Sequence, residues 1–337
     1  MSGYLIRRLI AMPFLILGII TITFFLSRFT KGDPLTAIIS EQQMSNPEVV
    51  AAARQRWGLD LSLPEQYLVY TGKLLTGDLG TSFASKRPVL QDLMERLPAT
   101  LELVMAAMAI GTLLGIVLGV LAAYYRNGWI DHTARLFALV GSSLPVFWSG
   151  LGLLFVLSVQ LGWLPGPGRL DARLTPPLMV TGMITIDTLL AGDLTAFLDA
   201  LHHLVLPAFV LGWTVTGTIS RLVRSNMLEV LNQEYVLTAR AKGAGELRVL
   251  LHHALRNTMV PTLTVIGHSF AYLITGAVLT ETIFAWPGMG SYAVEAARSL
   301  DYPAIIGVTI VGGVTFLVTN LLTDVAYVFA NPRIRLS

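Results

Sequence analysis

The chain has 337 residues, of which 54% are hydrophobic and 13% are charged, and its formal net charge is +2. Soluble domains carry about a quarter charged residues, so this composition excludes an ordinary soluble domain and favours a membrane protein. The small net charge gives no support for a nucleic-acid-binding protein, and the lack of cysteine in the sequence excludes disulfides, thiolate metal sites and cysteine nucleophiles.

The first apolar run, residues 9–29, follows a short basic segment, residues 1–8. A helix of about 20 mostly apolar residues can cross a bilayer, because it satisfies its own backbone hydrogen bonds. The run is too long for the apolar core of a secretory signal, and Arg28 and Lys31 stand where a small-residue cleavage site would be expected. We therefore predict a membrane anchor that is retained.

Five further apolar runs are long enough to cross the bilayer, and no repeat or linker divides the chain. They lie at residues 99–125, 133–161, 204–223, 258–284 and 304–329. Pro145 falls inside the run at 133–161, where it removes one hydrogen bond and bends the helix. The sequence thus predicts one all-α polytopic membrane domain with six transmembrane helices.

A shorter apolar stretch, residues 176–190, contains Asp187. It is short for a span, and one more span would place the basic segments after it on the opposite side of the membrane. We interpret this stretch as a folded or interfacial part of an outer loop.

Lysine and arginine in short loops set the orientation, because they are retained on the cytoplasmic side. With six spans, four basic segments fall on one side: 1–8, 126–132, 224–257 and 330–337. Both termini are therefore predicted to be cytoplasmic. The extracytoplasmic segments are then 30–98, 162–203 and 285–303.

A basic and polar island, residues 234–261, separates the fourth and fifth predicted spans. Asn232 is the expected N-cap of a short helix that ends before Gly243. A second, amphipathic helix is predicted from apolar residues at helical spacing, namely Leu247, Leu250, Leu251, Ala254 and Leu255. A loop that only sets topology needs charge, but it does not need this order of elements, so the island is interpreted as a docking element for a partner.

The sequence Tyr235-Val-Leu-Thr-Ala-Arg-Ala-Lys-Gly243, followed by His253-Ala-Leu-Arg-Asn257 and Pro261, resembles the EAA loop of ATP-binding-cassette importer permeases. The form is that of the dipeptide, oligopeptide and nickel branch. Departures from the general pattern of the family separate it from the sugar permeases, and they fall at Leu237, Thr238 and Arg256.

Further motifs support the resemblance along nearly the whole chain. They are Gly32-Asp33-Pro34, Gly77-Asp78-Leu79-Gly80, Pro98-Ala-Thr-Leu-Glu102, Pro145-Val-Phe-Trp148, Thr280-Glu-Thr-Ile-Phe284, Trp286-Pro-Gly-Met-Gly290 and Asn331-Pro-Arg333. The stretch Ile186-Asp187-Thr188 and the long second outer loop are most similar to B-type dipeptide permease subunits.

The resemblance implies a type I ABC importer permease fold and a translocation subunit for di- or oligopeptides in a bacterial cytoplasmic (inner) membrane. It also implies a second homologous permease, two ATP-binding cassette subunits and an extracytoplasmic substrate-binding protein as partners. The sequence lacks the Gly-x-x-x-x-Gly-Lys-Ser/Thr motif that holds the phosphates of ATP. The chain is therefore not expected to be an enzyme or to bind a cofactor, and ATP and Mg²⁺ are expected on the partner ATPases.

By the same resemblance, the first helix of the island is expected to couple the chain to the ATPase. The expected coupling residues are Glu234, Tyr235, Thr238, Ala239, Arg240, Ala241, Lys242 and Gly243. The positive charges of Arg240 and Lys242 would steer the helix towards an acidic partner surface.

Two regions are candidates for the translocation path or its gate. The candidate residues are Ser142, Ser143, Pro145, Phe147, Trp148, Glu281, Trp286, Pro287 and Gly288. Each region has an equally simple structural interpretation, either a proline bend that only packs helices or a turn with an interfacial tryptophan. Ionisable groups in spans, here Glu281 and Asp324, face protein or water, and pairing with an arginine at a helix end is the alternative.

Histidine pairs at 202–203 and 252–253 are adjacent in sequence, so their side chains point in different directions on a helix, and no metal site is predicted. Two alternatives stay open. One is another cargo for the same family, such as a nickel chelate, haem, an antimicrobial peptide or a sugar. The other is a secondary transporter, which would be expected to show broken paired helices or an inverted repeat.

Overall fold

The computed structural model describes residues 2–29, 35, 39, 44–56 and 60–330. The motifs at residues 32–34 and 331–333 lie outside these residues. Within the described part of the chain the secondary structure is helical, and the β pairing is limited to an isolated bridge between Thr81 and Pro88.

Among the described residues, three helices are long and apolar enough to cross a membrane individually. They are α6 (Val89–Tyr124), α10 (Leu194–Val230) and α16 (Tyr302–Ala330), the last through its segment Tyr302–Val325. A fourth span is formed if α7 (Trp129–Ser143) is counted together with α8 (Val146–Leu153) and the π-helical segment η1 (Leu154–Gln160). The remaining two predicted spans also coincide with helices. They are α1 (Ser2–Phe29), with a shorter apolar part at Ile10–Leu26, and α13 (Arg256–Gly276) followed by α14 (Val278–Ile283).

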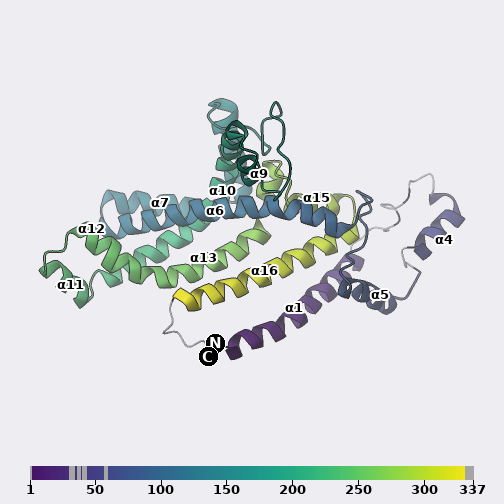
Figure 1. Ribbon diagram of the computed structural model, residues 1–337, viewed down its shortest axis with the longest axis horizontal. Coiled ribbons are helices and arrows are strands. Elements are labelled where there is room, and N and C mark those ends of the chain that lie inside the picture. The colour runs from purple at the N-terminus through teal and green to yellow at the C-terminus, as the bar shows by residue number, and fades with distance from the viewer. Residues whose placement is uncertain (1, 30–34, 36–38, 40–43, 57–59, 331–337) are drawn as a thin grey trace.

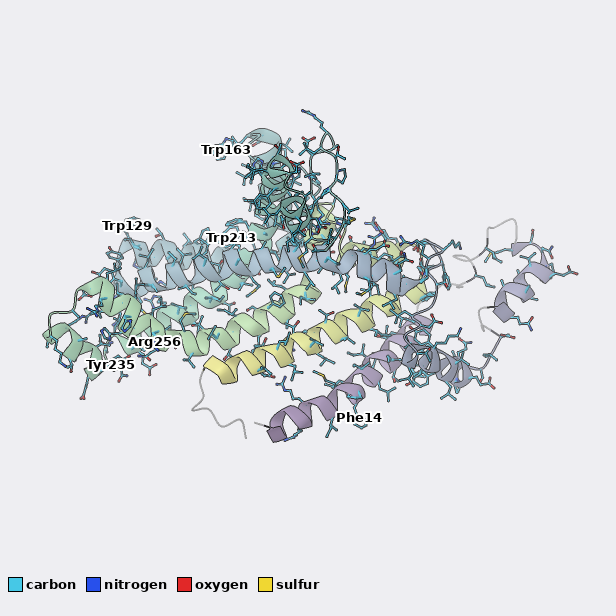
Figure 2. The ribbon with its side chains drawn as sticks, viewed as in Figure 1. Phe14, Trp129, Trp163, Trp213, Tyr235 and Arg256 are labelled. Carbon is cyan, nitrogen blue, oxygen red and sulfur yellow. The ribbon has the colours of Figure 1, made fainter. Side chains whose placement is uncertain are left out.

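The long helices run side by side along the long axis of the molecule (Figure 1). Helix α10 packs against α6, α7 and α13, while α16 packs against α13 and α1. Large exposed side chains such as Phe14 and Trp129 lie on the outside of this bundle (Figure 2), as expected where lipid replaces water.

A row of glycines on α6 brings it close to α10. A Cβ atom on Gly111 would lie 2.5 Å from the carbonyl oxygen of Gly212, and one on Gly115 would lie 2.7 Å from Cβ of Ile219. Gly119 meets Val223 in the same way, one turn further along. Small residues at a four-residue spacing are typical of membrane helices that pack at close range, because apolar side chains gain little by leaving lipid.

Several helices extend beyond the predicted spans. Helix α6 begins ten residues before residue 99, and α10 begins ten residues before residue 204, where the Asp193 side chain accepts a hydrogen bond from the backbone of Ala196 at 2.9 Å. Val89 and Leu93 in the extra part of α6 are fully buried, and Val89 packs against Gly307 of α16. Protein contacts thus continue these helices beyond their most apolar part.

The segments predicted to be outer loops are largely folded. They contain α4 (Pro47–Arg56), α5 (Leu63–Leu75), α9 (Ile184–Leu190) and α15 (Met289–Arg298). Helix α9 lies in a part of the chain that projects from one side of the bundle (Figure 1). The buried Asp187 carboxylate stabilises the turn before α9, because it accepts hydrogen bonds from the backbone of Thr181 at 2.7 Å and of Gly182 at 3.0 Å.

Candidate functional site

The island begins with α11 (Glu234–Ala241), whose N-cap residue is Gln233. The predicted N-cap at Asn232 is wrong, because the Asn232 amide donates a hydrogen bond to the Leu228 carbonyl at 2.7 Å and so belongs to the end of α10. The predicted stop at Gly243 is confirmed. Its φ of +81° lies in the left-handed region, and its amide closes the helix on the Arg240 carbonyl at 2.9 Å.

The predicted amphipathic helix is present, but it is not a separate element. Helix α12 (Glu246–Arg248) and the π-helical segment η2 (Val249–Leu255) continue directly into α13. The predicted buried face is partly wrong, since Leu247 and Leu251 are exposed. Instead Val249 and Ala254, five residues apart, are fully buried, because π-helical winding changes which residues share a face.

Helix α11 is tied to the start of α13. The Asn257 amide nitrogen donates to the Tyr235 hydroxyl oxygen at 2.6 Å, and that hydroxyl is 3.4 Å from the His253 carbonyl oxygen. Across the turn, the Arg240 guanidinium forms two hydrogen bonds with the Glu246 carboxylate, at 3.0 and 3.2 Å. Figure 2 shows Tyr235 and Arg256 at the same end of the bundle.

Most of α11 remains accessible. Val236 is the residue of this helix that is fully buried, and Ala239 is half-buried. The other expected coupling residues are exposed, namely Glu234, Tyr235, Thr238, Arg240, Ala241, Lys242 and Gly243. The island therefore presents a short, mostly polar surface that is hydrogen-bonded to the start of α13.

A second polar contact lies at the same end of the bundle, between α7 and α10. Arg224 donates two hydrogen bonds to the fully buried Asp131 carboxylate, at 2.8 and 2.7 Å, and the backbone of Asn127 donates a third at 3.0 Å. The hydrogen bonds from Arg224 are the main reason that the pKa of Asp131 falls to about 2. Sequence analysis treated Arg224 only as a topology signal, and its aspartate partner was missed.

The helix is interrupted at Leu144 and Pro145, between α7 and α8. Leu144 is extended, with ψ of 135°, because a proline disfavours the helical conformation of the residue before it, and Pro145 itself has ψ of 132°. The predicted bend at Pro145 is present, and it is far larger than a helix kink, since α7 and the helical segment after the break differ in direction by 110°.

This break forms one wall of a cavity of about 920 Å³ between α7, α10 and α13. Of the path candidates, Ser142, Ser143 and Pro145 line it. The cavity residues that sequence analysis missed include Thr214, Thr218 and Arg221 of α10 and His268, Ser269 and Tyr272 of α13. The first three recur at i, i+4 and i+7, so they share one face of a helix, and this polar stripe in an apolar span was the available signal.

Phe147 and Trp148 do not line this cavity and are exposed, at 47% and 58%.

The turn at residues 286–288, which is predicted to be an outer turn, is buried against α6. Trp286 has no exposed surface, and its indole nitrogen donates to the Ala99 carbonyl at 2.7 Å. The interpretation of Trp286 as an interfacial tryptophan is therefore wrong. Pro287 is exposed, whereas Gly288 is buried.

Glu281 organises this turn from within the protein. Its fully buried carboxylate accepts hydrogen bonds from the Thr100 hydroxyl at 2.7 Å and from the Ser291 amide at 2.9 Å. The Thr100 hydroxyl in turn accepts the Met289 amide at 2.8 Å. The other candidate ionisable group, Asp324, pairs with Arg8 near the opposite ends of α16 and α1.

The loop before α9, which is predicted to be an outer loop, is attached to the same region. Arg169 pairs with the buried Glu102 carboxylate of α6, and its guanidinium carbon lies 5.3 Å from the ring centre of Trp286. The backbone of Thr185 donates to the same carboxylate at 2.8 Å. The Trp286 turn, α6 and the outer loop thus form one connected contact.

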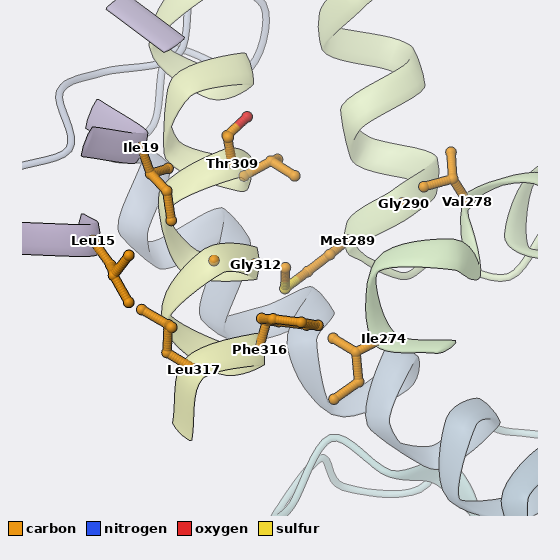
Figure 3. Close-up of a pocket in the computed structure, with 12 residues that line it drawn as sticks. Leu15, Ile19, Ile274, Val278, Met289, Gly290, Thr309, Gly312, Phe316 and Leu317 are labelled. Atoms are coloured by element: carbon orange, nitrogen blue, oxygen red, sulfur yellow. The ribbon is translucent and has the colours of Figure 1, made fainter. Parts of the chain in front are cut away.

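A second cavity, of about 540 Å³, lies between α1, α13, α14, α15 and α16 (Figure 3). It is lined by apolar side chains and glycines such as Leu15, Ile274 and Phe316, with the single hydroxyl of Thr309. It lacks the polar groups that orient a polar ligand, so the cavity beside Pro145 is the better candidate for a path taken by polar cargo.

Comparison with known proteins identifies two family models along the chain. The model described as "Binding-protein-dependent transport system inner membrane component" matches residues 115–336, and its N-terminal companion matches residues 1–104. One similar protein is the di/tripeptide transport system permease protein DppB of Pseudomonas aeruginosa, at 44% identity over 99% of both chains. Another is the probable D,D-dipeptide transport system permease protein DdpB of Escherichia coli, at 43% identity over 94% of this chain and 93% of that protein.

The oligopeptide transport system permease protein AppB of Bacillus subtilis is 38% identical over 99% of both chains. Among solved structures, a chain of the MetNI methionine ABC transporter in an inward-facing conformation has a TM-score of 0.53 at 15% identity. It covers 73% of this chain and 98% of its own length. That likeness supports the fold alone.

Proposed function

The chain belongs to the family of binding-protein-dependent transport system inner membrane components, and we propose that it is the membrane-spanning translocation subunit of an ATP-driven importer of di- or oligopeptides. Peptide permeases that are about 40% identical over nearly the full chain support this cargo class. The observation that carries the proposal within the molecule is the exposed helix α11, which ends at Gly243 and is tied to α13.

The proposed topology has six transmembrane helices in a bacterial inner membrane, with both termini cytoplasmic. Helices α1 and α16 are antiparallel, because Arg8 pairs with Asp324 and Ile19 packs on Gly313. Helices α13 and α16 are antiparallel as well, since Gly267 packs on Thr323 and the cavity of Figure 3 joins Ile274 to Phe316. The start of α1, the end of α16 and the island therefore lie towards one side, as the distribution of basic residues requires.

The proposed complex contains a second homologous permease, two ATPase subunits and an extracytoplasmic substrate-binding protein. ATP and Mg²⁺ are used by the ATPase subunits. Helix α11 and the two residues after it, from Glu234 to Gly243, dock on an ATPase subunit. The outer turn at Trp286, Pro287 and Gly288 faces the side from which the binding protein delivers cargo.

Coupling follows from the continuity of α13. Asn257 near its start contacts α11, whereas His268 and Tyr272 on the same helix line the polar cavity. A movement of α11 imposed by the ATPase is therefore expected to reach the cavity wall along α13, which contains Pro261 between these two contacts. Because ATP binding favours one ATPase arrangement, it also favours the cavity shape that is connected to that arrangement.

Reconstitution tests this function. The tagged chain is purified from its own host with its partner subunits and incorporated into proteoliposomes, with the binding protein outside and ATP inside. We expect a radiolabelled dipeptide to accumulate only when both ATP and the binding protein are present. Uptake that depends on an ion gradient and not on ATP would indicate a secondary transporter, and ATP-dependent uptake of nickel chelate, haem or sugar without peptide uptake would overturn the peptide assignment.

A further inference from the structure

The cavity between α7, α10 and α13 carries the positive charge of Arg221 without a carboxylate among its described lining residues. Its described lining residues include Arg221 and His268 but neither aspartate nor glutamate. The remaining polar groups are neutral hydroxyls, from Ser142, Ser143, Thr214, Thr218, Ser269 and Tyr272. Arg221 is an exposed residue of this wall, and its positive charge favours an anionic group in the cavity and disfavours an ammonium group.

Arg221 is held in the cavity without being neutralised. Its Nη1 donates to the Ser142 hydroxyl oxygen at 3.0 Å, and that hydroxyl donates to the Leu139 carbonyl at 3.2 Å. No ion pair joins Arg221 to a carboxylate in the part of the chain that the structure describes. Arg224, one turn further along α10, shows the contrast, because its Nε and Nη2 both donate to the Asp131 carboxylate.

A guanidinium carries five N–H donors in a planar fork that matches a carboxylate. One of these donors is used by Ser142, which leaves donors for a carboxylate in the cavity. The volume of about 920 Å³ is within the range of small-molecule sites, so a di- or tripeptide has room there.

We propose that Arg221 is a specificity residue that binds the C-terminal carboxylate of the peptide cargo in this cavity, with Ser142 positioning its guanidinium. The inference rests on the proposed function and names the part of the cargo that this subunit recognises. Free peptides share this carboxylate whatever their sequence, and with a pKa of about 3.5 it is ionised at neutral pH. An arginine that binds it selects for free peptides without selecting among side chains.

The test compares two probes, alanylalanine and its C-terminal amide, in proteoliposomes that contain the complete importer. The binding protein is saturated with either probe, and loading is measured, so that each uptake rate is expressed per loaded binding protein. For the wild type we expect the free acid to be taken up about tenfold faster than the amide, since a charge-assisted bidentate pair is lost with the amide. For Arg221→Gln we expect the ratio to fall close to one, and for Arg221→Lys we expect an intermediate ratio.

The ratio of the uptake rates of the free acid and the amide separates an effect on recognition from an effect on folding, because a loss of folded protein lowers both uptake rates equally. Arg126→Gln, which removes one positive charge from an exposed residue outside the cavity, is the matched control and should keep the wild-type ratio. A wild-type ratio in Arg221→Gln would overturn the proposal. Loss of both probes in both Arg221 variants at normal membrane abundance would assign Arg221 a structural role and would overturn it as well. Failure of the proposed function itself is distinct, since the wild-type importer would then take up neither probe.

Discussion

The hydroxyl of Tyr235 in the exposed helix α11 accepts a hydrogen bond of 2.6 Å from Asn257, which lies 22 residues later, near the start of α13. This contact joins the surface proposed for the ATPase to the helix that lines the polar cavity. It is a side-chain contact between exposed residues, so its removal tests coupling with little effect on the core.

Tyr235→Phe removes this hydrogen bond and keeps the ring. A hydrogen bond contributes about 0.5–1.5 kcal/mol, so we expect ATP-dependent peptide uptake to fall about two- to tenfold, with ATP hydrolysis continuing. The measurement is the number of peptides transported per ATP in proteoliposomes. Tyr125→Phe, at an exposed tyrosine in the loop before α7, is the control and should transport like the wild type.

Gly243→Trp should uncouple transport while the chain still folds. A Cβ at Gly243 meets no atom within 4 Å, so an indole extends over the exposed side of the island, where we place the ATPase. The left-handed φ of +81° adds a local backbone cost of about 1 kcal/mol. We expect normal abundance of the variant in the membrane and loss of ATP-dependent peptide uptake.

Gly77→Trp is the matched control for this variant. Gly77 also has a φ of +81° and open space around it, but it lies between α5 and α6, in the segment predicted to be extracytoplasmic. It therefore carries the same backbone cost without touching the island. Normal uptake by Gly243→Trp at equal abundance would rule out the assignment of α11 as the coupling helix.

Asp131→Asn should destabilise the contact between α7 and α10, because Arg224 keeps its charge and loses an ionised partner. We expect a loss of about 1–3 kcal/mol in the free energy of unfolding at pH 7, measured by thermal unfolding in detergent. The exposed pair of Arg87 and Glu95 supplies the comparison, and Glu95→Gln should cost less than about 1 kcal/mol.

The effect of Asp131 should also depend on pH. Its pKa is lowered in the folded chain, from 3.8 to about 2, so the carboxylate contributes stability that is complete above about pH 4 and is lost as the pH falls towards 2. The difference in melting temperature between the wild type and Asp131→Asn should therefore be constant from pH 7 to about pH 5 and should shrink below pH 4. An equal difference at pH 3 and pH 7 would contradict this account.

Gly288→Ala should destabilise the outer turn through Glu281. The added Cβ would lie 2.4 Å from the Glu281 carboxylate, which cannot move without losing its hydrogen bonds to Thr100 and Ser291. We expect a melting temperature several degrees below that of the wild type. Gly152→Ala in α8, where a Cβ meets nothing within 4 Å, should leave it unchanged.

A double variant isolates this clash. In the Glu281→Ala background the carboxylate is absent, so the further change Gly288→Ala should cost much less than it does in the wild type. Additive effects of the two changes would show that Gly288 is required for a reason other than its contact with Glu281.

Some of these features could be predicted because they depend on neighbours in the sequence. A long apolar run predicts a membrane helix from its composition, and helices occur at all six predicted spans. Pro145 and Gly243 act on their own backbone and the residue beside them, so the break after α7 and the end of α11 were expected at those positions.

Other features depend on residues that are distant in sequence. The N-cap at Gln233 replaced Asn232 because the Asn232 side chain completes the preceding helix, and the π-helical turn at Val249–Leu255 altered the buried face of the island. The burial of Trp286 against Ala99 and of Glu281 against Thr100 joins segments more than 180 residues apart. No local pattern encodes such pairs.

The sequence by itself therefore determined that this is a membrane protein, where its helices lie and to which family it belongs. It also identified the helix through which the chain is proposed to receive energy from ATP. The tertiary structure decided which polar residues line a cavity, as Arg221 does, and which are buried in hydrogen-bonded contacts between segments, as Glu281 is. The physical reason is that hydropathy and backbone preference act within a few residues, whereas the surroundings of a side chain are set by the helices that pack around it.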